Sequence, residues 1–221
     1  MPLNERLRFL RSCLSGPGTV GAVAPSSRKL AQALCDPFRR CDKPATVLEI
    51  GAGTGAVTRH IGSLLGPNDE LDICEIDPEF VDILENKVLS TATFAPAVRA
   101  GRVRVVCAAA QAIPHEDRYD FIISGLPLTA FSLEDVEAVL GMVRRALKPG
   151  AVFSYFEYVG LRKISRTFSM GKHRARLREV SPYLNKHIRT YEFDQQYVIG
   201  NLPPAVARHL RYTKQTAATH S

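Results

Sequence analysis

The chain has 221 residues, a formal net charge of +7 and an ordinary apolar content of 45%. This length suits one domain with a substantial core, and no apolar run approaches the roughly 18–20 residues that a membrane-spanning helix needs. The first residues carry charge throughout, which excludes the apolar core of a signal peptide. Five cysteines without a C-x-x-C pair predict neither a zinc site nor a disulfide framework, and they favour a reducing cytoplasm.

The first predicted element is an amphipathic helix at the N-terminus. Leu3, Leu7, Leu10 and Leu14 lie on one helical stripe, and arginines occupy the other faces. Such a helix either lies in a membrane interface or docks on the domain, and the pattern alone does not decide between them. Next, Pro25–Ser27 is typical of the cap of a second helix.

From Ala45 onward, short apolar strands alternate with helices. Strands are expected at Val47–Ile50, Leu71–Glu75, Val103–Cys107, Phe121–Ser124 and Val152–Tyr158, with helices between them and two further strands at Ile188–Phe193 and Gln196–Ile199. This alternation predicts an α/β fold with a mostly parallel sheet of seven strands and helices on both faces. The expected units are an N-terminal segment over residues 1–35, a domain over 36–212 and a disordered tail over 213–221.

Positive charge is concentrated in residues 161–190. This segment holds nine Lys or Arg residues and one acid, Glu179, so its charge exceeds that of the whole chain. It interrupts the alternation of strands and helices, and we interpret it as a basic insertion. A patch of this sign meets phosphate on nucleic acid or on an anionic membrane, unless it is only a solvated helix face.

Residues 47–55, V-L-E-I-G-A-G-T-G, place three alternate glycines between a strand and a helix. Glycines let the backbone approach a ligand closely, and a helix N-terminus favours an anionic group. Glu49 precedes the turn, and Glu75 ends the next strand, where a carboxylate can accept both hydroxyls of a ribose. The dinucleotide fingerprint G-x-G-x-x-G differs, because here the third glycine comes one residue early.

This arrangement resembles the class I S-adenosylmethionine methyltransferases, which have a Rossmann-like fold. The resemblance implies an enzyme with S-adenosylmethionine as its cofactor. It implies that Glu49 anchors the methionine amino end and that Glu75 and Ile76 lie at the ribose, and the residues that cradle the cofactor are Gly51, Ala52, Gly53 and Gly55. Ala109 stands where this family often has an Asp for adenine, so adenine would depend on the backbone near Ala110 or on Gln111.

The segment Ser124-Gly-Leu-Pro-Leu128 resembles the (D/N/S)-P-P-(Y/F) motif of amine methyltransferases. An amine nucleophile must be neutral and aimed by acceptors, here the Ser124 hydroxyl and the carbonyls of Gly125 or Leu126. Ser124 would also border the cofactor. Adenine methyltransferases need an aromatic ring after the proline to stack the flipped base. Leu128 cannot stack, which counts against a nucleobase substrate.

Four segments of the chain also resemble, in their order and spacing, motifs of the bacterial phospholipid N-methyltransferases. These enzymes methylate phosphatidylethanolamine towards phosphatidylcholine. They are Gly21–Arg28, the glycine turn, the Ser124 turn and Asn201–Ala205. The resemblance implies a cytoplasmic enzyme that associates peripherally with the inner face of the cytoplasmic membrane through its N-terminal helix. It also implies that Gly21–Ser27 lies over the cofactor.

Residues at the end of the fifth strand are candidates for the substrate site. Tyr155, Glu157 and Tyr158 are predicted to surround the ammonium head group, with Glu157 or Tyr158 as the proton acceptor. His115 and His173 are alternative bases on loops.

The basic segment supplies the remaining candidates. Arg162, Lys163 and Arg166 would neutralise the phosphodiester of the lipid and hold the enzyme on an anionic surface. Three alternatives stay open: an ornithine lipid as the substrate, an rRNA adenine N6-methyltransferase, and a cofactor-binding protein without activity. Nucleic acid is the less favoured partner.

Overall fold

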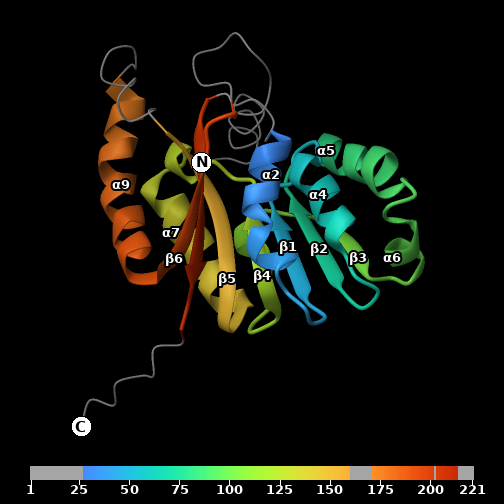
Figure 1. The fold of residues 1–221 in the computed structure, drawn as a ribbon. Helices are drawn as coiled ribbons and strands as arrows, with labels where there is room; N and C mark the ends of the chain where they lie inside the picture. The colour runs from blue at the N-terminus through green and yellow to red at the C-terminus, as the bar shows by residue number, and fades with distance from the viewer. Residues whose placement is uncertain (1–26, 160–170, 202, 214–221) are drawn as a thin grey trace.

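The computed structural model describes residues 27–159, 171–201 and 203–213, without the side chains of residues 171–177. Its centre is a seven-stranded sheet in the order β3-β2-β1-β4-β5-β7-β6 (Figure 1). The strands are β1 (Thr46–Ile50), β2 (Glu70–Glu75), β3 (Val103–Cys107), β4 (Tyr119–Ser124), β5 (Leu147–Tyr158), β6 (Glu192–Val198) and β7 (Ala205–Arg211). β1 to β5 are parallel, and β7 runs antiparallel to β5 and β6. The predicted mostly parallel sheet is confirmed.

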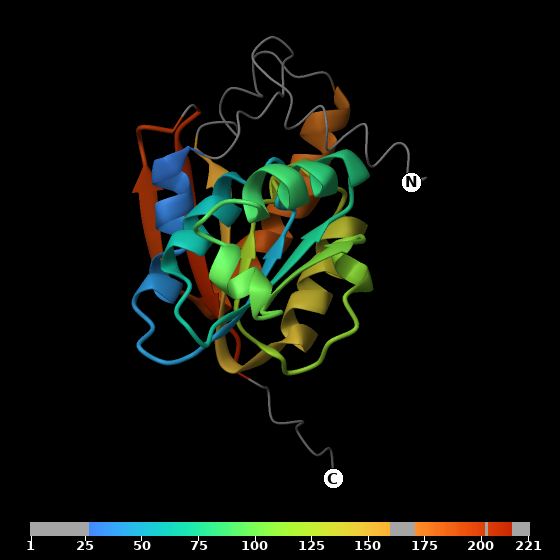
Figure 2. The same ribbon diagram turned by 90° about the vertical axis from the view of Figure 1, so that its right-hand side faces the viewer.

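Helices cover both faces of the sheet (Figures 1 and 2). They are α2 (Arg28–Leu34), α3 (Asp36–Arg39), α4 (Ala56–Leu64), α5 (Pro78–Ile83) with a π-helical continuation η1 (Leu84–Leu89), α6 (Ala95–Arg99), α7 (Leu133–Ala146) and α9 (Gly171–Tyr191). Single 3-10 turns form η2 (Ala110–Ala112) and η3 (Leu128–Ala130). α2 and α4 lie on one face, and α7 and α9 lie on the other.

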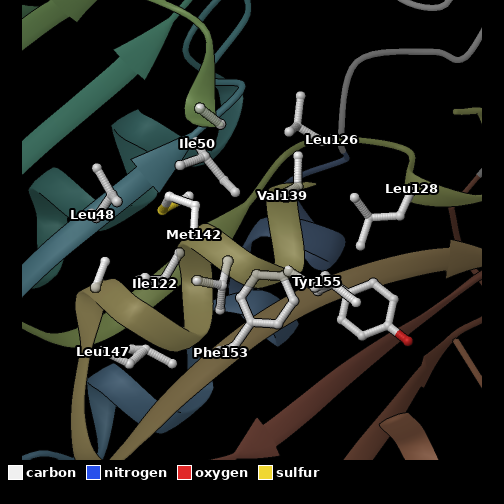
Figure 3. Close-up of a cluster of buried hydrophobic side chains, with 14 of the residues drawn as sticks. Leu48, Ile50, Ile122, Leu126, Leu128, Val139, Met142, Leu147, Phe153 and Tyr155 are labelled. Atoms are coloured by element: carbon white, nitrogen blue, oxygen red, sulfur yellow. The ribbon is translucent and has the colours of Figure 1, made fainter. Parts of the chain in front are cut away.

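Each face of the sheet has its own apolar core, because alternate residues of a strand point to opposite sides. On β1, Leu48 and Ile50 belong to the core under α7 and α9, whereas Val47 belongs to the core under α2 and α4. Figure 3 shows side chains of α7 packed among those of β1, β4 and β5. Glu49 shares the face of Val47, so its carboxylate lies within an apolar layer.

The strands and caps predicted up to Tyr158 are present. Ser27 caps α2 by accepting a hydrogen bond from the N–H of Leu30 at 3.2 Å. Every predicted strand in this part forms, although β5 begins at Leu147, well before the expected Val152. The predicted helix over Leu3–Leu14 and most of the predicted tail lie outside the described residues.

The C-terminal part corrects the sequence prediction. The expected strand at Ile188–Phe193 is wrong, because α9 continues to Tyr191 and β6 begins at Glu192. Val180 and Leu184 face the core, and Ile188 continues their helical spacing of four. β7 was not predicted, because its residues are mostly buried on both faces and show no alternation.

The basic segment is partly a helix of the domain. Its residues from Gly171 onward form α9, and Val180 and Leu184 of this helix belong to the core. This part of the predicted insertion over 161–190 is therefore integral to the layer that covers the sheet. Residues 160–170 lie outside the described part of the chain.

The described ranges contain no helix that is long and apolar enough to span a bilayer. The cysteines described, Cys35, Cys41, Cys74 and Cys107, are all free. Among these same residues, no group of three His, Cys, Asp or Glu side chains is placed to hold a metal ion.

Candidate active site

Three predicted site segments lie at the carboxyl ends of adjacent strands. The glycine turn follows β1, Glu75 ends β2 and Ser124 ends β4. The chain goes from β1 outward to β2 and β3, and it later returns to β4 on the other side of β1. In open α/β sheets, ligands bind outside the carboxyl ends of the strands at such a switch point.

The glycine turn is packed directly against the turn after β4. Gly51, Gly53 and Gly55 have φ angles of 68°, 54° and 81°, in the left-handed region that favours glycine. A Cβ on Gly51 would lie 2.2 Å from the side chain of Leu126, and one on Gly125 would lie 2.4 Å from the carbonyl oxygen of Gly51. The two turns therefore pack backbone against backbone, in a contact that has no room for a side chain at Gly51 or Gly125.

Glu75 ties the glycine turn to the end of β2. Its Oε2 accepts a hydrogen bond from the N–H of Gly53 at 2.7 Å. Its Oε1 accepts from the N–H groups of Ile76 and Asp77 at 2.8 and 2.9 Å. Burial raises the pKa of Glu75, although these three donors oppose that change. A carboxylate has about four lone-pair positions, so one remains for a ribose hydroxyl.

Glu49 is a fully buried carboxylate that has no charge partner among the described residues. Its exposed fraction is 0%, and within the described ranges neither oxygen accepts a hydrogen bond of normal geometry. Burial raises its pKa to about 8, the nearby charge of Glu75 adds to this, and Thr58 opposes it only in part. A cationic amino group is the partner that such a carboxylate lacks. The site thus fits the methionine end of S-adenosylmethionine.

The segment after β3 offers backbone donors where adenine is expected. The N–H of Ala108 donates to the carbonyl oxygen of Glu75 at 3.0 Å, which holds this segment beside Glu75. η2 begins at Ala110, and the N–H groups of Ala110 and Gln111 have no acceptor in the described part of the chain. They remain available to the adenine ring in spite of Ala109.

Of the three acceptors predicted in the Ser124 turn, the carbonyl oxygen of Gly125 is the one that accepts no hydrogen bond within the described ranges. The Ser124 hydroxyl is buried and accepts from the N–H of Leu126 at 3.2 Å, and the carbonyl of Leu126 accepts from Leu128 at 3.0 Å. Nothing in the described ranges donates to the carbonyl of Gly125. Leu128 is 0% exposed in the core under α9, so its side chain does not face the site.

The residues at the end of β5 do not form the predicted single cluster. Tyr155 and Glu157 share one face of the strand, and the Tyr155 hydroxyl donates to Oε1 of Glu157 at 3.3 Å. Tyr158 belongs to the core on the opposite face, where it packs against Phe156. The reason is the two-residue period of a strand, which separates position 158 from 155 and 157.

Arg208 completes the group around Glu157, and the sequence analysis missed it. Its Nε lies 3.4 Å from Oε2 of Glu157, and its Nη1 donates to Glu192 at 2.6 Å. The negative charge of Glu157 is thus offset within the protein. Burial raises the pKa of Tyr155 well above its usual value, so its hydroxyl stays protonated; Figure 3 shows this hydroxyl directed away from the apolar cluster. Arg208 lies in β7, a strand that was not predicted from the sequence. Without this strand, nothing in the sequence places Arg208 beside Glu157.

The other basic candidates are not at the described site. His115 packs against Tyr119, which begins β4 at the edge of the sheet opposite Ser124. His115 is therefore excluded as the base. The side chain of His173 and the residues Arg162, Lys163 and Arg166 lie outside the described part of the chain.

The sequence is similar to known methyltransferases. A family model described as a methyltransferase domain matches residues 47–150. The ornithine lipid N-methyltransferase of Singulisphaera acidiphila is 30% identical over 146 residues, which cover 66% of this chain and 74% of that protein. The ubiquinone/menaquinone biosynthesis C-methyltransferase UbiE of Stutzerimonas stutzeri is 30% identical over 115 residues, or 51% of this chain and 41% of that protein. The chain thus spans less than half of this second relative.

Solved structures share the fold. The 1,6-didemethyltoxoflavin-N1-methyltransferase of Burkholderia thailandensis, with bound S-adenosylhomocysteine, has a TM-score of 0.59 at 19% identity and covers 97% of this chain and 92% of its own. A putative rRNA methylase of Clostridium thermocellum has a TM-score of 0.60 at 16% identity, covering 88% of this chain and 99% of its own.

Together, the glycine turn at the switch point and the buried acids define a class I methyltransferase with S-adenosylmethionine as its cofactor. The chain belongs to the S-adenosylmethionine-dependent methyltransferases, and an ornithine lipid N-methyltransferase is among its relatives.

Proposed function

We propose that this enzyme methylates the amine of a membrane lipid head group. Phosphatidylethanolamine, converted towards phosphatidylcholine, is the first candidate substrate. An ornithine lipid is the second, because a relative named for that lipid matches over 74% of its own length. The sequence motifs shared with bacterial phospholipid N-methyltransferases support the first candidate.

The Gly125 carbonyl carries the proposal on the structural side. It belongs to a turn that touches Gly51 of the glycine turn, and no donor in the described ranges occupies it. A backbone acceptor at this place suits a nucleophile that has an N–H to donate. A carbon nucleophile, as in C-methylation of a quinone, does not use such an acceptor.

The chemistry follows from these positions. When bound, S-adenosylmethionine supplies an electrophilic methyl group that a neutral amine displaces in line. In this proposal Glu49 and the glycine turn hold the methionine end, and Glu75 holds the ribose. The carbonyl of Gly125 accepts an N–H of the substrate and so directs the nitrogen lone pair toward the methyl group. Glu157 lies at the end of the neighbouring strand β5, and in this proposal it accepts the proton of the amine while Arg208 balances its charge.

A nucleobase is the less favoured substrate. A flipped adenine needs an aromatic ring beside the proline of the turn. Leu128 holds that position and is fully buried in the core. In this proposal, the net charge of +7 attracts the enzyme to anionic lipid at the inner face of the cytoplasmic membrane.

The test is methyl transfer with a labelled cofactor. The purified protein would receive, in separate detergent-micelle reactions, phosphatidylethanolamine, an ornithine lipid, unmodified rRNA or a demethylated quinone. We expect label in one or both lipids and in neither of the other substrates. Label in rRNA or quinone without label in lipid overturns the proposal, and the Gly125→Ala variant serves as the control for background transfer.

A further inference from the structure

Exposed apolar side chains gather at the edge of the sheet that carries the site. Ile199 is 82% exposed, Tyr197 63% and Val159 41%. β6 and β5 both point toward this edge, so the turn after β6 lies beside the end of β5 (Figure 1). The N–H of Val159 donates to the carbonyl oxygen of Pro204 in this turn at 2.7 Å. Single exposed apolar residues are ordinary, but a local group of them at one edge is a candidate interaction surface.

The turn that carries Ile199 is stabilised by side-chain hydrogen bonds of a buried residue. Asn201 is 4% exposed, and its Oδ1 accepts a hydrogen bond from the N–H of Ser27 at 3.2 Å. Its Nδ2 donates to the carbonyl oxygen of Pro203 at 2.7 Å. The turn is therefore fastened to the beginning of α2, and it presents Ile199 outward on a supported loop.

Positive charge lies beside the same turn. Arg28 and Lys29 are exposed at the beginning of α2, and Nζ of Lys29 lies 3.2 Å from the position of a Cβ on Gly200. An apolar tip with basic side chains beside it is complementary to an anionic bilayer.

We propose that the β6–β7 turn inserts Ile199, together with Tyr197 and Val159, into the interface of an anionic lipid bilayer. Insertion at this edge turns the carboxyl ends of the strands, and with them the methyl-transfer site, toward the membrane. Tyr197 suits the interfacial region because its ring is apolar and its hydroxyl is polar. The proposal rests on the proposed lipid substrate, and it adds a second contact that is separate from the N-terminal helix.

The absence of tryptophan from the chain makes a direct test available. Ile199→Trp places a single fluorophore at the tip of the turn, and Phe193→Trp is the matched control on the same strand, roughly 20 Å away at the other edge. Phe193 is 46% exposed. With phosphatidylcholine vesicles that contain phosphatidylglycerol, we expect blue-shifted emission and quenching by tail-brominated lipid for Ile199→Trp alone. Unshifted emission from protein that sediments with the vesicles overturns the proposal and leaves a protein partner as the occupant of this surface.

A second variant separates insertion from catalysis. Ile199→Asn is expected to lower the vesicle partition coefficient about tenfold, whereas Val98→Asn, at a 42% exposed site on α6, leaves it unchanged. Methyl transfer to lipid in detergent micelles should be the same for Ile199→Asn and the parent protein. Equal vesicle binding of the two Asn variants contradicts the inserted turn. Failure of the parent protein to methylate micellar lipid contradicts the proposed function instead.

Discussion

At the residue scale, Glu49 is a carboxylate whose burial is unfavourable for its charged form. A cationic group that binds beside it would relieve this cost. Its carboxylate is enclosed on the α4 side of β1, where the described part of the chain supplies no ion-pair partner, and its pKa rises to about 8. At neutral pH the empty site therefore holds mostly the protonated acid. A cationic amino group favours the ionised form, so cofactor binding should release a proton from Glu49.

The first prediction concerns the pH dependence of cofactor affinity. From pH 6.5 to about 8 we expect the affinity for S-adenosylmethionine to rise, because Glu49, with its pKa of about 8, increasingly has no proton to lose on binding while the amino group of the ligand is still cationic. Glu49→Gln should bind weakly and without this dependence. Calorimetry in two buffers of different ionisation enthalpy measures both the affinity and the released proton. Affinity that is equally pH-dependent in Glu49→Gln would assign the titration to another group.

The same residue predicts a pH effect on stability. A carboxyl with a raised folded-state pKa keeps its proton while the unfolded chain releases it, so stability falls as pH rises from about 4.5 to about 8. Each pKa unit corresponds to about 1.4 kcal/mol. Glu49→Gln should therefore gain stability over the parent protein at pH 8.5 but not at pH 4.5, as measured by urea unfolding. Glu85→Gln, at an exposed position, should show no such difference.

Glu75 differs from Glu49 because it already holds backbone donors. Glu75→Ala removes the acceptor for the N–H of Gly53 and, in the proposed site, the acceptor for the ribose. We expect cofactor binding to weaken by about 1–3 kcal/mol, the usual cost when hydrogen bonds to a charged group are lost. Titration calorimetry measures the change, with Glu85→Ala as the surface control. Unchanged affinity would remove Glu75 from the ribose role.

At the scale of elements, the contact between the two turns determines the geometry of the site. Gly125→Ala would place a Cβ 2.4 Å from the carbonyl oxygen of Gly51, so the turns must separate. A displacement of about 1 Å in a catalytic site can cost about 100-fold in rate, and we expect methyl transfer to fall at least tenfold. Gly141→Ala on α7 is the control, since a Cβ there meets nothing within 4 Å. Equal rates for the two variants would show that the Gly125 turn does not position the substrate.

At the scale of the whole molecule, the charge distribution predicts how the enzyme meets a surface. Deletion of residues 1–14 removes the apolar stripe with its arginines, and it should weaken binding to anionic vesicles in flotation assays. The remaining binding should fall further with added salt, because salt screens positive charges such as those of Arg28 and Lys29. Deletion of residues 214–221 is the control. Unchanged binding after the first deletion would assign the membrane contact to the domain itself.

The fold, and the positions in it of the residues proposed to hold the cofactor, could be predicted because their signals are local in the chain. The glycine turn, Glu49 and Glu75 lie within one strand–turn–helix–strand unit, and their spacing alone places them at one edge of the sheet. The cap at Ser27 is equally local, and its side chain accepts the backbone N–H of Leu30. The run over Ile188–Phe193 misled the prediction because it spans the end of α9, where Tyr191 still packs against the core, and the beginning of β6.

The substrate half of the site depends on contacts between distant parts of the chain. The sequence by itself determined the class of enzyme and the cofactor, since both rest on short motifs with fixed backbone requirements. Only the tertiary structure decided that Arg208 pairs with Glu157 and that Ile199 lies beside the end of β5. The physical reason is the position of β7 between β5 and β6: it joins residues about 50 positions apart through sheet hydrogen bonds, and no local pattern encodes that pairing.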